Sequence, residues 1–241
     1  MENCKIEVLI TRYREHVDWI RYIIKNVDFI YIYNKGPDTN FFAHFDITPY
    51  KSKIKIITLP NIGRIDHTLA YHIVEHWDNL PDTLVNLPAS IMMCKLKGHY
   101  LSAIMKRINS MEKYSGFYGP RFSRVGNNFN YHINDYQAEG ACNKNDNPFI
   151  KSEYPDFKAW KKAIIDERPM CYIAMRGMFA ISRDNILHID KAVYERLKLS
   201  LSVGDNIENG HFAERIWAHL FRQYSFDKKI TVLQSDTQKT E

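Results

Sequence analysis

The segment from Asn61 to His67 carries a dense set of polar side chains that could bind a ligand. It reads NIGRIDH, so that an amide, a guanidinium, a carboxylate and an imidazole are grouped around one glycine. Gly63 allows the backbone to approach a ligand closely, and the planar fork of Arg64 suits a diphosphate. Apolar residues at helical spacing follow, and a helix N-terminus favours an anion. We therefore expect Asn61, Gly63, Arg64 and His67 to bind an anionic ligand.

A structural explanation of the same segment stays open. Arg64 could pair with Asp66, and His67 could cap the helix, for which Asp66 is also a plausible N-cap. A single glycine is neither a P-loop nor a GxGxxG motif. The spacing alone therefore does not choose between a ligand site and an ordered turn.

Polar residues also follow the first two predicted strands. A nucleotide base could stack on Tyr13, while Thr11 and Arg12 bond the edge of the base or the ribose. Asn34 and Lys35 follow the next strand in the segment YNKG. The alternative for both groups is a solvated turn.

Three carboxylates surround the start of the last predicted helix. Asp205, Glu208 and Glu214 are each able to act as a general base that takes the proton of an acceptor hydroxyl. A carboxylate near a helix N-terminus is also favourable electrostatics without any catalytic role. The sequence leaves all three as catalytic candidates.

One histidine pair has a spacing that could bind a metal. His72 and His76 enclose HIVEH, which resembles the inverted zinc-protease signature HxxEH. A third ligand would have to come from further along the chain. The alternative is that both histidines lie on the solvated face of an amphipathic helix.

The elements that position these residues predict a mainly parallel, Rossmann-like α/β sheet. Short apolar runs predict strands, and each of the first three ends in one of the polar segments described above. Ligands bind such sheets at the carboxyl ends of the strands, so these segments should converge. The predicted strands are Ile6–Ile10, Phe29–Tyr33, Lys53–Leu59 and Thr83–Leu87.

The second half of the chain is less regular, and no repeat or linker divides residues 1–241 into domains. Residues 115–155 are rich in Gly, Asn, Tyr and Phe and could form a binding loop or a lid. Tyr172–Ile181 reads as a strand interrupted at Arg176-Gly177, and the final residues SDTQKTE should be frayed. The predicted helices are Asp18–Lys25, the segment from Asp66 to Trp77, Gly98–Met111, Phe157–Asp166, Asp190–Leu201 and His211–Phe221.

Composition narrows the class of protein. The 241 residues are 45% hydrophobic with a net charge of +5, which fits a globular protein that binds phosphate-bearing molecules. The positive charges are scattered, which argues against nucleic acid as the partner. The four cysteines show no metal spacing and should be free, buried thiols. No signal peptide or membrane span is indicated, so we expect a soluble, cytoplasmic protein.

Several segments together resemble a glycosyltransferase-like family of the GT-A type, found in microbes and large DNA viruses. The resemblance covers most of the chain except roughly residues 115–155. It assigns residues 1–95 to a nucleotide-binding half and residues 165–235 to an acceptor-side half. The segments that carry it are RYREHVDWI, IYNKG, NIGRIDHTLAYHIVEHWDNLPD and LPAS, then RGMFAISRDNIL, YERL and HFAERIW.

The resemblance implies transfer of a hexose or pentose from a nucleotide-sugar donor to a hydroxyl of a glycan or glycoprotein. Glu214 of HFAERIW is then the best-matched catalytic carboxylate, with Glu208 as the next choice. Residues that would contact the donor are Thr11, Arg12, Tyr13, Asn34, Asn61, Gly63 and Arg64. Residues that would line the acceptor side are Arg176, Gly177, Met178 and Phe179.

One departure from the GT-A pattern concerns the metal. Most such enzymes hold Mn²⁺ or Mg²⁺ with a DxD motif at a strand end, where this sequence reads Pro88-Ala89-Ser90. Either the metal is held differently, or Arg64, Lys95 and Lys97 neutralise the diphosphate. The sequence therefore assigns no metal ligand and no certain cofactor. Two alternatives stay open: a non-catalytic nucleotide- or glycan-binding protein, and a metal-dependent hydrolase.

Overall fold

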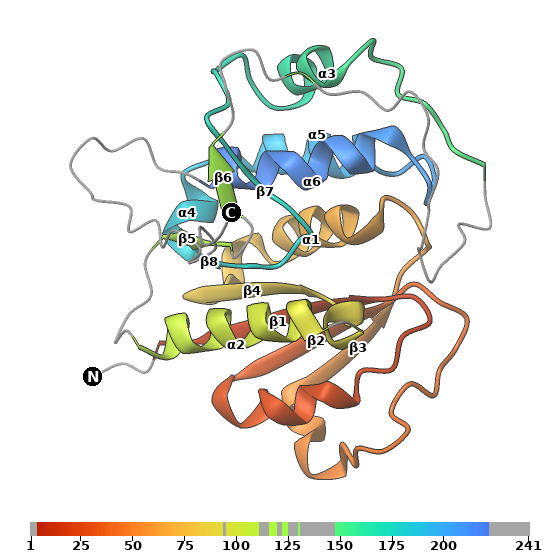
Figure 1. Cartoon of the computed structure of the whole chain (residues 1–241), viewed down its shortest axis with the longest axis vertical. Coiled ribbons are helices and arrows are strands. Elements are labelled where there is room, and N and C mark those ends of the chain that lie inside the picture. The colour runs from red at the N-terminus through yellow and green to blue at the C-terminus, as the bar shows by residue number, and fades with distance from the viewer. Residues whose placement is uncertain are drawn as a thin grey trace, which may run out of the picture.

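A six-stranded, mostly parallel sheet forms the centre of the protein (Figure 1). The computed structural model describes residues 4–93, 95–110, 116–119, 122–124, 130 and 148–221. The first four strands are parallel, whereas the fifth in the spatial order is antiparallel to both of its neighbours. From edge to edge the strands are β3 (Ile54–Thr58), β2 (Phe29–Asn34), β1 (Ile6–Arg12), β4 (Thr83–Pro88), β8 (Phe179–Ser182) and β5 (Phe117–Tyr118).

The central strand β1 is buried on both sides. Leu9 belongs to one hydrophobic cluster, while Val8 and Ile10 belong to a second cluster on the opposite face. Alternate side chains of a strand point to opposite faces, so a continuous apolar run fits a strand that is covered on both. The mainly parallel α/β sheet flanked by helices is thus confirmed.

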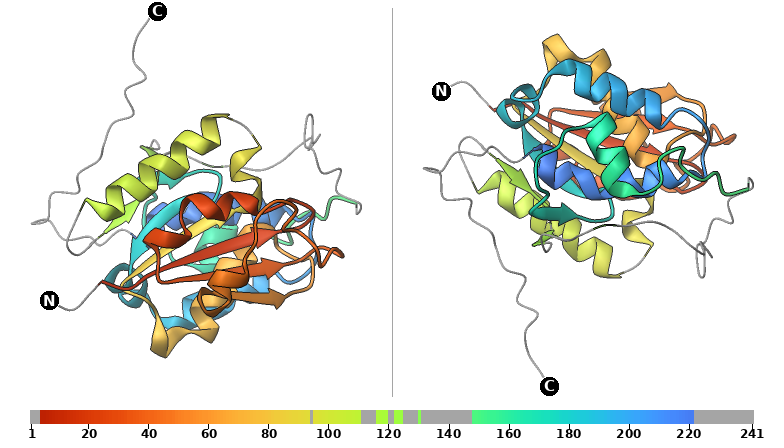
Figure 2. Two further views of the ribbon diagram at one scale, coloured as in Figure 1. Left: turned by 90° about the horizontal axis from the view of Figure 1, so that it is seen from below. Right: turned by 90° about the horizontal axis from the view of Figure 1, so that it is seen from above.

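Helices cover both faces of this sheet, as the views from below and above show (Figure 2). On one face lie α1 (Arg64–Glu75), α3 (Phe157–Ile164), α4 (Arg183–Leu187), α5 (Lys191–Ser200) and α6 (Glu208–Leu220). On the other lie α2 (Lys95–Asn109) and the 3-10 helices η1 (Asp18–Tyr22) and η2 (Ile24–Asn26). The remaining elements are η3 (Thr48–Lys53), η4 (Trp77–Asn79), η5 (Ala89–Met92), and a separate two-stranded sheet of β6 (Phe122–Arg124) and β7 (Tyr172–Ala174).

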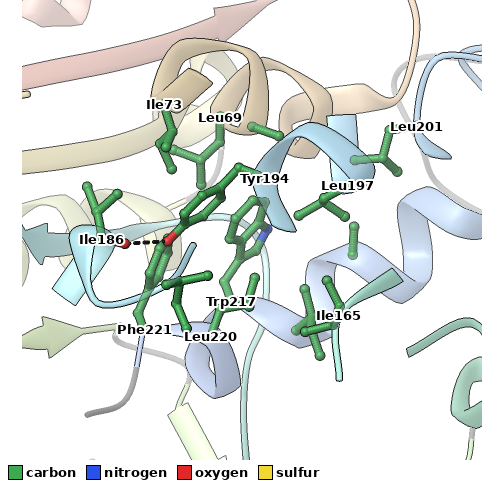
Figure 3. Close-up of a cluster of buried hydrophobic side chains, with 14 of the residues drawn as sticks. Leu69, Ile73, Ile165, Ile186, Tyr194, Leu197, Leu201, Trp217, Leu220 and Phe221 are labelled. Carbon is green, nitrogen blue, oxygen red and sulfur yellow. Dashed lines mark hydrogen bonds between the residues drawn. The ribbon is translucent and has the colours of Figure 1, made fainter. Parts of the chain in front are cut away.

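The core between α1, α5 and α6 is aromatic as well as aliphatic (Figure 3). The rings of Trp217 and Phe221 stack with their centroids 5.4 Å apart. The buried hydroxyl of Tyr194 donates to the carbonyl of Ile186 at 3.0 Å, so this polar atom does not remain unpaired. This packing fixes the positions of α1 and α6, the two helices that border the candidate site.

Three predicted helices differ from the structure in type or extent. Residues 18–25 form η1 and η2 instead of one α-helix, because their backbone N–H groups bond to the carbonyl three residues earlier, as from Ile23 to Ile20. The backbone N–H groups on either side of this short connection bond to other segments, that of Val17 to the carbonyl of Phe41 and that of Asp28 to the carbonyl of Ile6. The last helix begins at Glu208 and α2 begins at Lys95, each three residues earlier than expected.

Two predicted strands also differ from the structure. β1 extends to Arg12, because Thr11 and Arg12 pair with Tyr33 and Asn34 of β2. The expected strand Tyr172–Ile181 is divided by the turn at Arg176-Gly177 into β7 and β8, which belong to different sheets.

Other expectations concern segments that are only partly described. Cys4 and Cys171 are free but half-buried instead of buried, whereas Cys94 and Cys142 lie outside the described residues. Most of residues 115–155, the expected loop or lid, and the segment SDTQKTE also lie outside them. Within the described part of the chain, no helix has the length and apolarity needed to span a membrane.

The orientation of α5 gives a direct test of the core. Leu197 is fully buried, whereas Leu199 on the same helix is 72% exposed. We expect Leu197→Ala to lower the free energy of unfolding by about 2–5 kcal/mol, and Leu199→Ala to change it by less than about 0.5 kcal/mol. Urea denaturation of both variants checks this, and equal losses would contradict the orientation of the helix.

Candidate functional site

The order of the strands reverses between β1 and β4. From β1 the chain continues to β2 and β3 on one side, and then crosses to β4 on the other. Ligands of open α/β sheets bind outside the carboxyl ends of the strands at such a switch point. Because Thr11 pairs with Pro88 where these two strands end, the segments around them border the candidate site.

The loops after β1 and β2 are held together by Arg12. Its guanidinium donates to Asn34 Oδ1 at 2.5 Å and to the carbonyl of Asp38 at 3.0 Å. It also lies over the ring of Phe41, with the central carbon 4.3 Å from the ring centroid. Arg12 is 1% exposed, so its side chain and that of Asn34 stabilise the loops.

Lys35 connects the loop after β2 to the start of α1. Its buried ammonium donates to the carbonyls of Ile62 and Arg64, both at 2.5 Å. Burial lowers the pKa of Lys35 to about 7, an effect that nearby Asp66 opposes. The next residue, Gly36, packs so closely that a Cβ there would lie 1.6 Å from the carbonyl oxygen of Tyr13. The three loops therefore form one connected layer.

The start of α1 packs against the turn between α5 and α6 (Figure 1). Gly63, at φ 55°, donates its N–H to the carbonyl of Gly204 at 2.6 Å. A Cβ at Gly63 would lie 2.4 Å from the carbonyl oxygen of Leu201, so only glycine fits this contact. The amide of Asn61 donates to Asp205 Oδ2 at 3.1 Å across the same contact.

Asp66 is a buried carboxyl inside the first turn of α1. The expectation that it caps the helix was wrong, because the N-cap is Gly63. Its Oδ1 instead accepts a 2.7 Å bond from the indole N–H of Trp217 on α6. Burial raises the pKa of Asp66 to about 7, helped by Glu214 and opposed by the Trp217 bond. The carboxyl therefore links the two helices of the site.

Two arginines at the site have a strained backbone. Arg64 has φ 54° and Arg176 has φ 73°, and each neighbours a glycine that also has positive φ. The two turns touch, since a Cβ at Gly177 would lie 3.1 Å from the side chain of Ile65. Non-glycine residues at positive φ are uncommon, and they cluster at functional sites.

The turn of Arg176 is held from two sides. Glu214 Oε1 accepts a 2.7 Å bond from the N–H of Arg176. Asn86 of β4 donates to the carbonyl of Gly177, also at 2.7 Å. Among the described residues, no side chain bonds to the guanidinium of Arg176 or forms an ion pair with it. The backbone of the turn is therefore fixed, whereas the guanidinium of Arg176 is available to a ligand.

The guanidinium of Arg64 lies against the imidazole of His211 on α6, 3.0 Å from its Nε2. Burial lowers the pKa of His211 to about 3, with further contributions from Arg64 and Arg215. The imidazole is therefore neutral at physiological pH and does not repel the guanidinium. Arg215 donates to the carbonyl of His211 at 2.6 Å and so lies one turn further along the same helix.

The three candidate carboxylates have different surroundings. Asp205 bonds Asn61, and the nearly buried Glu208 accepts the N–H of Ser152 at 3.0 Å. The side chain of Glu214 is 22% exposed, and its Oε2 lies 3.8 Å from Arg215. Of these three, Glu214 is the carboxylate that bonds the turn of Arg176, and it also lies close enough to Asp66 in the first turn of α1 to help raise its pKa.

Other predicted positions are less accessible. Met178 and Phe179 are buried in the two opposite core clusters, so only their backbone could contact an acceptor. Lys95 is the first residue of α2, and its side chain lies outside the described part. Thr11 Oγ1 and Asn86 Oδ1 are buried without a hydrogen-bond partner among the described residues.

The histidines of α1 differ from the sequence-based expectation. His72 is fully buried and shares a 3.0 Å hydrogen bond with the hydroxyl of Tyr33. His76 is half-buried, and its ring stacks on the ring of His72. Neither lies on a solvated face. His67 is buried, and its Nδ1 has no partner in the described part. No group of three or more His, Cys, Asp or Glu side chains that could hold a metal occurs among the described residues.

The sequence did not identify His211 and Arg215 as site residues. It also did not show that Lys35 connects the loop after β2 to the start of α1. His211 and Arg215 follow one another at i, i+4 in HFAER, a spacing that places both on one face of a helix. A glycine next to an arginine in both NIGRI and MRGMF was a further signal for related turns.

Fold and site together define a Rossmann-like α/β protein with a polar site at the carboxyl edge of its sheet. No family model matches the chain, and no curated protein gives a significant match. The chain is similar to a crystal structure of 4-diphosphocytidyl-2C-methyl-D-erythritol synthase, with 12% identity over 85% of this chain and 92% of that chain. The TM-score is 0.32, and this likeness does not bear on function.

Asp66 should make stability depend on pH. Because burial raises its pKa from 3.8 to about 7, the folded state binds this proton more tightly than the unfolded state. Its contribution to stability is therefore present below about pH 4 and is lost as the pH rises to about 7. In Asp66→Asn the amide oxygen can still accept the Trp217 bond, but the group no longer titrates.

Urea denaturation at about pH 4.5 and about pH 7.5 checks this. Relative to wild type, we expect Asp66→Asn to gain at least about 1 kcal/mol at the higher pH. The exposed Asp78→Asn serves as the control and should follow the wild type. An unchanged difference between wild type and Asp66→Asn would show that the carboxyl does not titrate in this range.

Proposed function

We propose that the protein transfers a sugar from a nucleotide-sugar donor to a hydroxyl of a glycan or glycoprotein. The observation that supports this best is the position of Glu214. Its carboxylate lies at the carboxyl edge of the sheet, bonded to the strained turn of Arg176 and close to the start of α1. A carboxylate and cationic side chains at this edge are what displacement of a diphosphate by a hydroxyl requires.

The chemistry is a direct displacement. The acceptor hydroxyl oxygen forms a bond to the anomeric carbon, and the bond from that carbon to the diphosphate oxygen breaks. The hydroxyl proton moves to Glu214, and the nucleoside diphosphate leaves with the electron pair. Glu214 suits this role because the bond from Arg176 N–H orients the carboxylate while the side chain stays partly exposed.

The two other carboxylates are placed differently. Glu208 is 6% exposed and bonds Ser152, so it ties residues 150–152 to the start of α6. Asp205 bonds Asn61 and thereby ties the segment before α1 to the same region. Both carboxylates therefore contribute to the shape of the site, and we assign the base to Glu214.

Nucleotide binding is the first prediction of this function. We expect UDP or GDP at about 100 times its dissociation constant to stabilise the protein by about 2.7 kcal/mol, visible as a rise in Tm. The thermal-shift series is repeated with Mn²⁺ and with EDTA. No response to any nucleoside diphosphate, together with a loss of stability in EDTA alone, would instead favour a metal-dependent hydrolase.

Turnover separates an enzyme from a binding protein. With water as a surrogate acceptor, we expect release of UDP or GDP from a matching nucleotide sugar. Glu214→Gln should lower kcat by about 10²- to 10⁴-fold while nucleotide binding is kept, because the amide oxygen can still accept the bond from Arg176. Glu195→Gln, at an exposed position on α5, is the matched control.

Glu208→Gln decides the identity of the base. It should leave kcat within a few-fold of wild type, since its carboxylate is bonded to Ser152. A large loss in Glu208→Gln with full activity in Glu214→Gln would reverse the assignment. Nucleotide binding without any turnover would leave a binding protein.

A further inference from the structure

We propose that Arg64, Arg176 and Arg215, the arginine cluster, bind the diphosphate of the donor and neutralise its charge without a divalent ion. This inference rests on the proposed function, because it assumes that the ligand is a nucleoside diphosphate sugar. It differs from the sequence-based assignment, which places Arg176 on the acceptor side and Arg64 with Lys95 and Lys97 on the diphosphate.

A continuous set of contacts joins the three arginines along the first half of α6. The guanidinium of Arg64 lies 3.0 Å from His211 Nε2. Arg215 Nη1 donates to the carbonyl of His211 and lies 3.8 Å from Glu214 Oε2. Glu214 Oε1 in turn accepts the N–H of Arg176. The cluster is thus gathered from α1, α6 and the turn before β8.

The charge of this cluster suits a dianion. Glu214, a partly exposed carboxylate, lies near the guanidinium of Arg215 and bonds the backbone of Arg176. The guanidinium of Arg64 lies against His211 one turn earlier on α6. His211 adds no charge, because burial and the neighbouring arginines hold its pKa at about 3. Asp66 is buried behind the cluster and bonded to Trp217, and its pKa is raised to about 7. An excess of positive charge therefore remains for an anion such as a diphosphate.

Guanidinium groups match this ligand in geometry as well as charge. Each presents parallel N–H donors that can bond two phosphate oxygens at once. Arg64 also belongs to the first turn of α1, whose free backbone N–H groups favour an anion. These donors provide several charge-assisted bonds to the two phosphates.

Backbone strain at two members of the cluster points to the same role. Glycine adopts positive φ without steric cost, so it would be the less strained residue at both positions. Arginine occupies them instead, at φ 54° and φ 73°. The surrounding contacts fix both turns, through Lys35 at the carbonyl of Arg64 and through Glu214 at the N–H of Arg176. Strain maintained in this way is typical of ligand-binding sites.

The test uses inorganic pyrophosphate and orthophosphate as probes on the whole protein. Isothermal titration is carried out in EDTA and again in buffer without EDTA or added metal ions. We expect pyrophosphate to bind at least about tenfold more tightly than orthophosphate, with the same affinity in both conditions.

Glycine substitutions remove the side chain without adding strain. We expect Arg64→Gly and Arg176→Gly each to weaken pyrophosphate binding by about 10- to 100-fold. Tm should stay unchanged or rise in Arg176→Gly, and should change little in Arg64→Gly because the relief of backbone strain offsets the lost contact with His211. Arg21→Ala, an exposed arginine of η1 on the opposite face of the sheet, should bind as wild type does. Arg215 is left intact because its bond to the His211 carbonyl supports α6.

The results separate this proposal from the proposed function. Unchanged affinity in both glycine variants, or pyrophosphate binding that is lost in EDTA, overturns the arginine cluster even when sugar transfer is observed. Binding that depends on Arg64 and Arg176 supports the arginine cluster even when no nucleotide sugar is turned over. In that case only the proposed sugar transfer is refuted.

Discussion

The contact between the start of α1 and the turn after α5 is the constraint on which the candidate site depends. At Gly63 a Cβ would lie 2.4 Å from the carbonyl oxygen of Leu201, so the helix can approach this closely only without a side chain. The approach brings Asp66 to Trp217 and Arg64 to His211. Because α6 also carries Glu214, a single close contact sets the distance between Arg64 at the start of α1 and this carboxylate.

Polar residues at strand ends have two different uses in this fold. Arg12 and Asn34 are buried and bond one another, and Lys35 bonds backbone carbonyls of the next segment. Each satisfies loop groups that would otherwise lack partners, which makes the loops rigid. Arg64 and Arg176 instead project from turns that other residues hold. A rigid supporting layer of this kind is what a precisely shaped ligand site needs.

The sheet could be predicted from the sequence because its strands are short apolar runs and each ends in a polar segment. The predicted convergence of these segments at one edge agrees with the parallel pairing of β1, β2 and β3. The division of polar residues between support and site could not be predicted, because burial depends on contacts made far along the chain, such as Arg12 with Phe41. The pairing of Asp66 with Trp217, separated by 151 positions, is equally invisible to local pattern. Periodicity likewise cannot show that Gly63, and not Asp66, ends the turn before α1.

The two arginines at positive φ also have a meaning for protein engineering. A design procedure that scores only the folded state would favour glycine at both positions because it relieves the backbone, and the exchange at Arg176 removes no bond made by its guanidinium, whereas that at Arg64 removes the contact with His211. Directed evolution for heat resistance would favour the same exchanges. These two positions therefore distinguish selection for stability of the fold from selection for ligand binding. Arginine kept at both positions in natural variants of the protein would indicate selection for ligand binding.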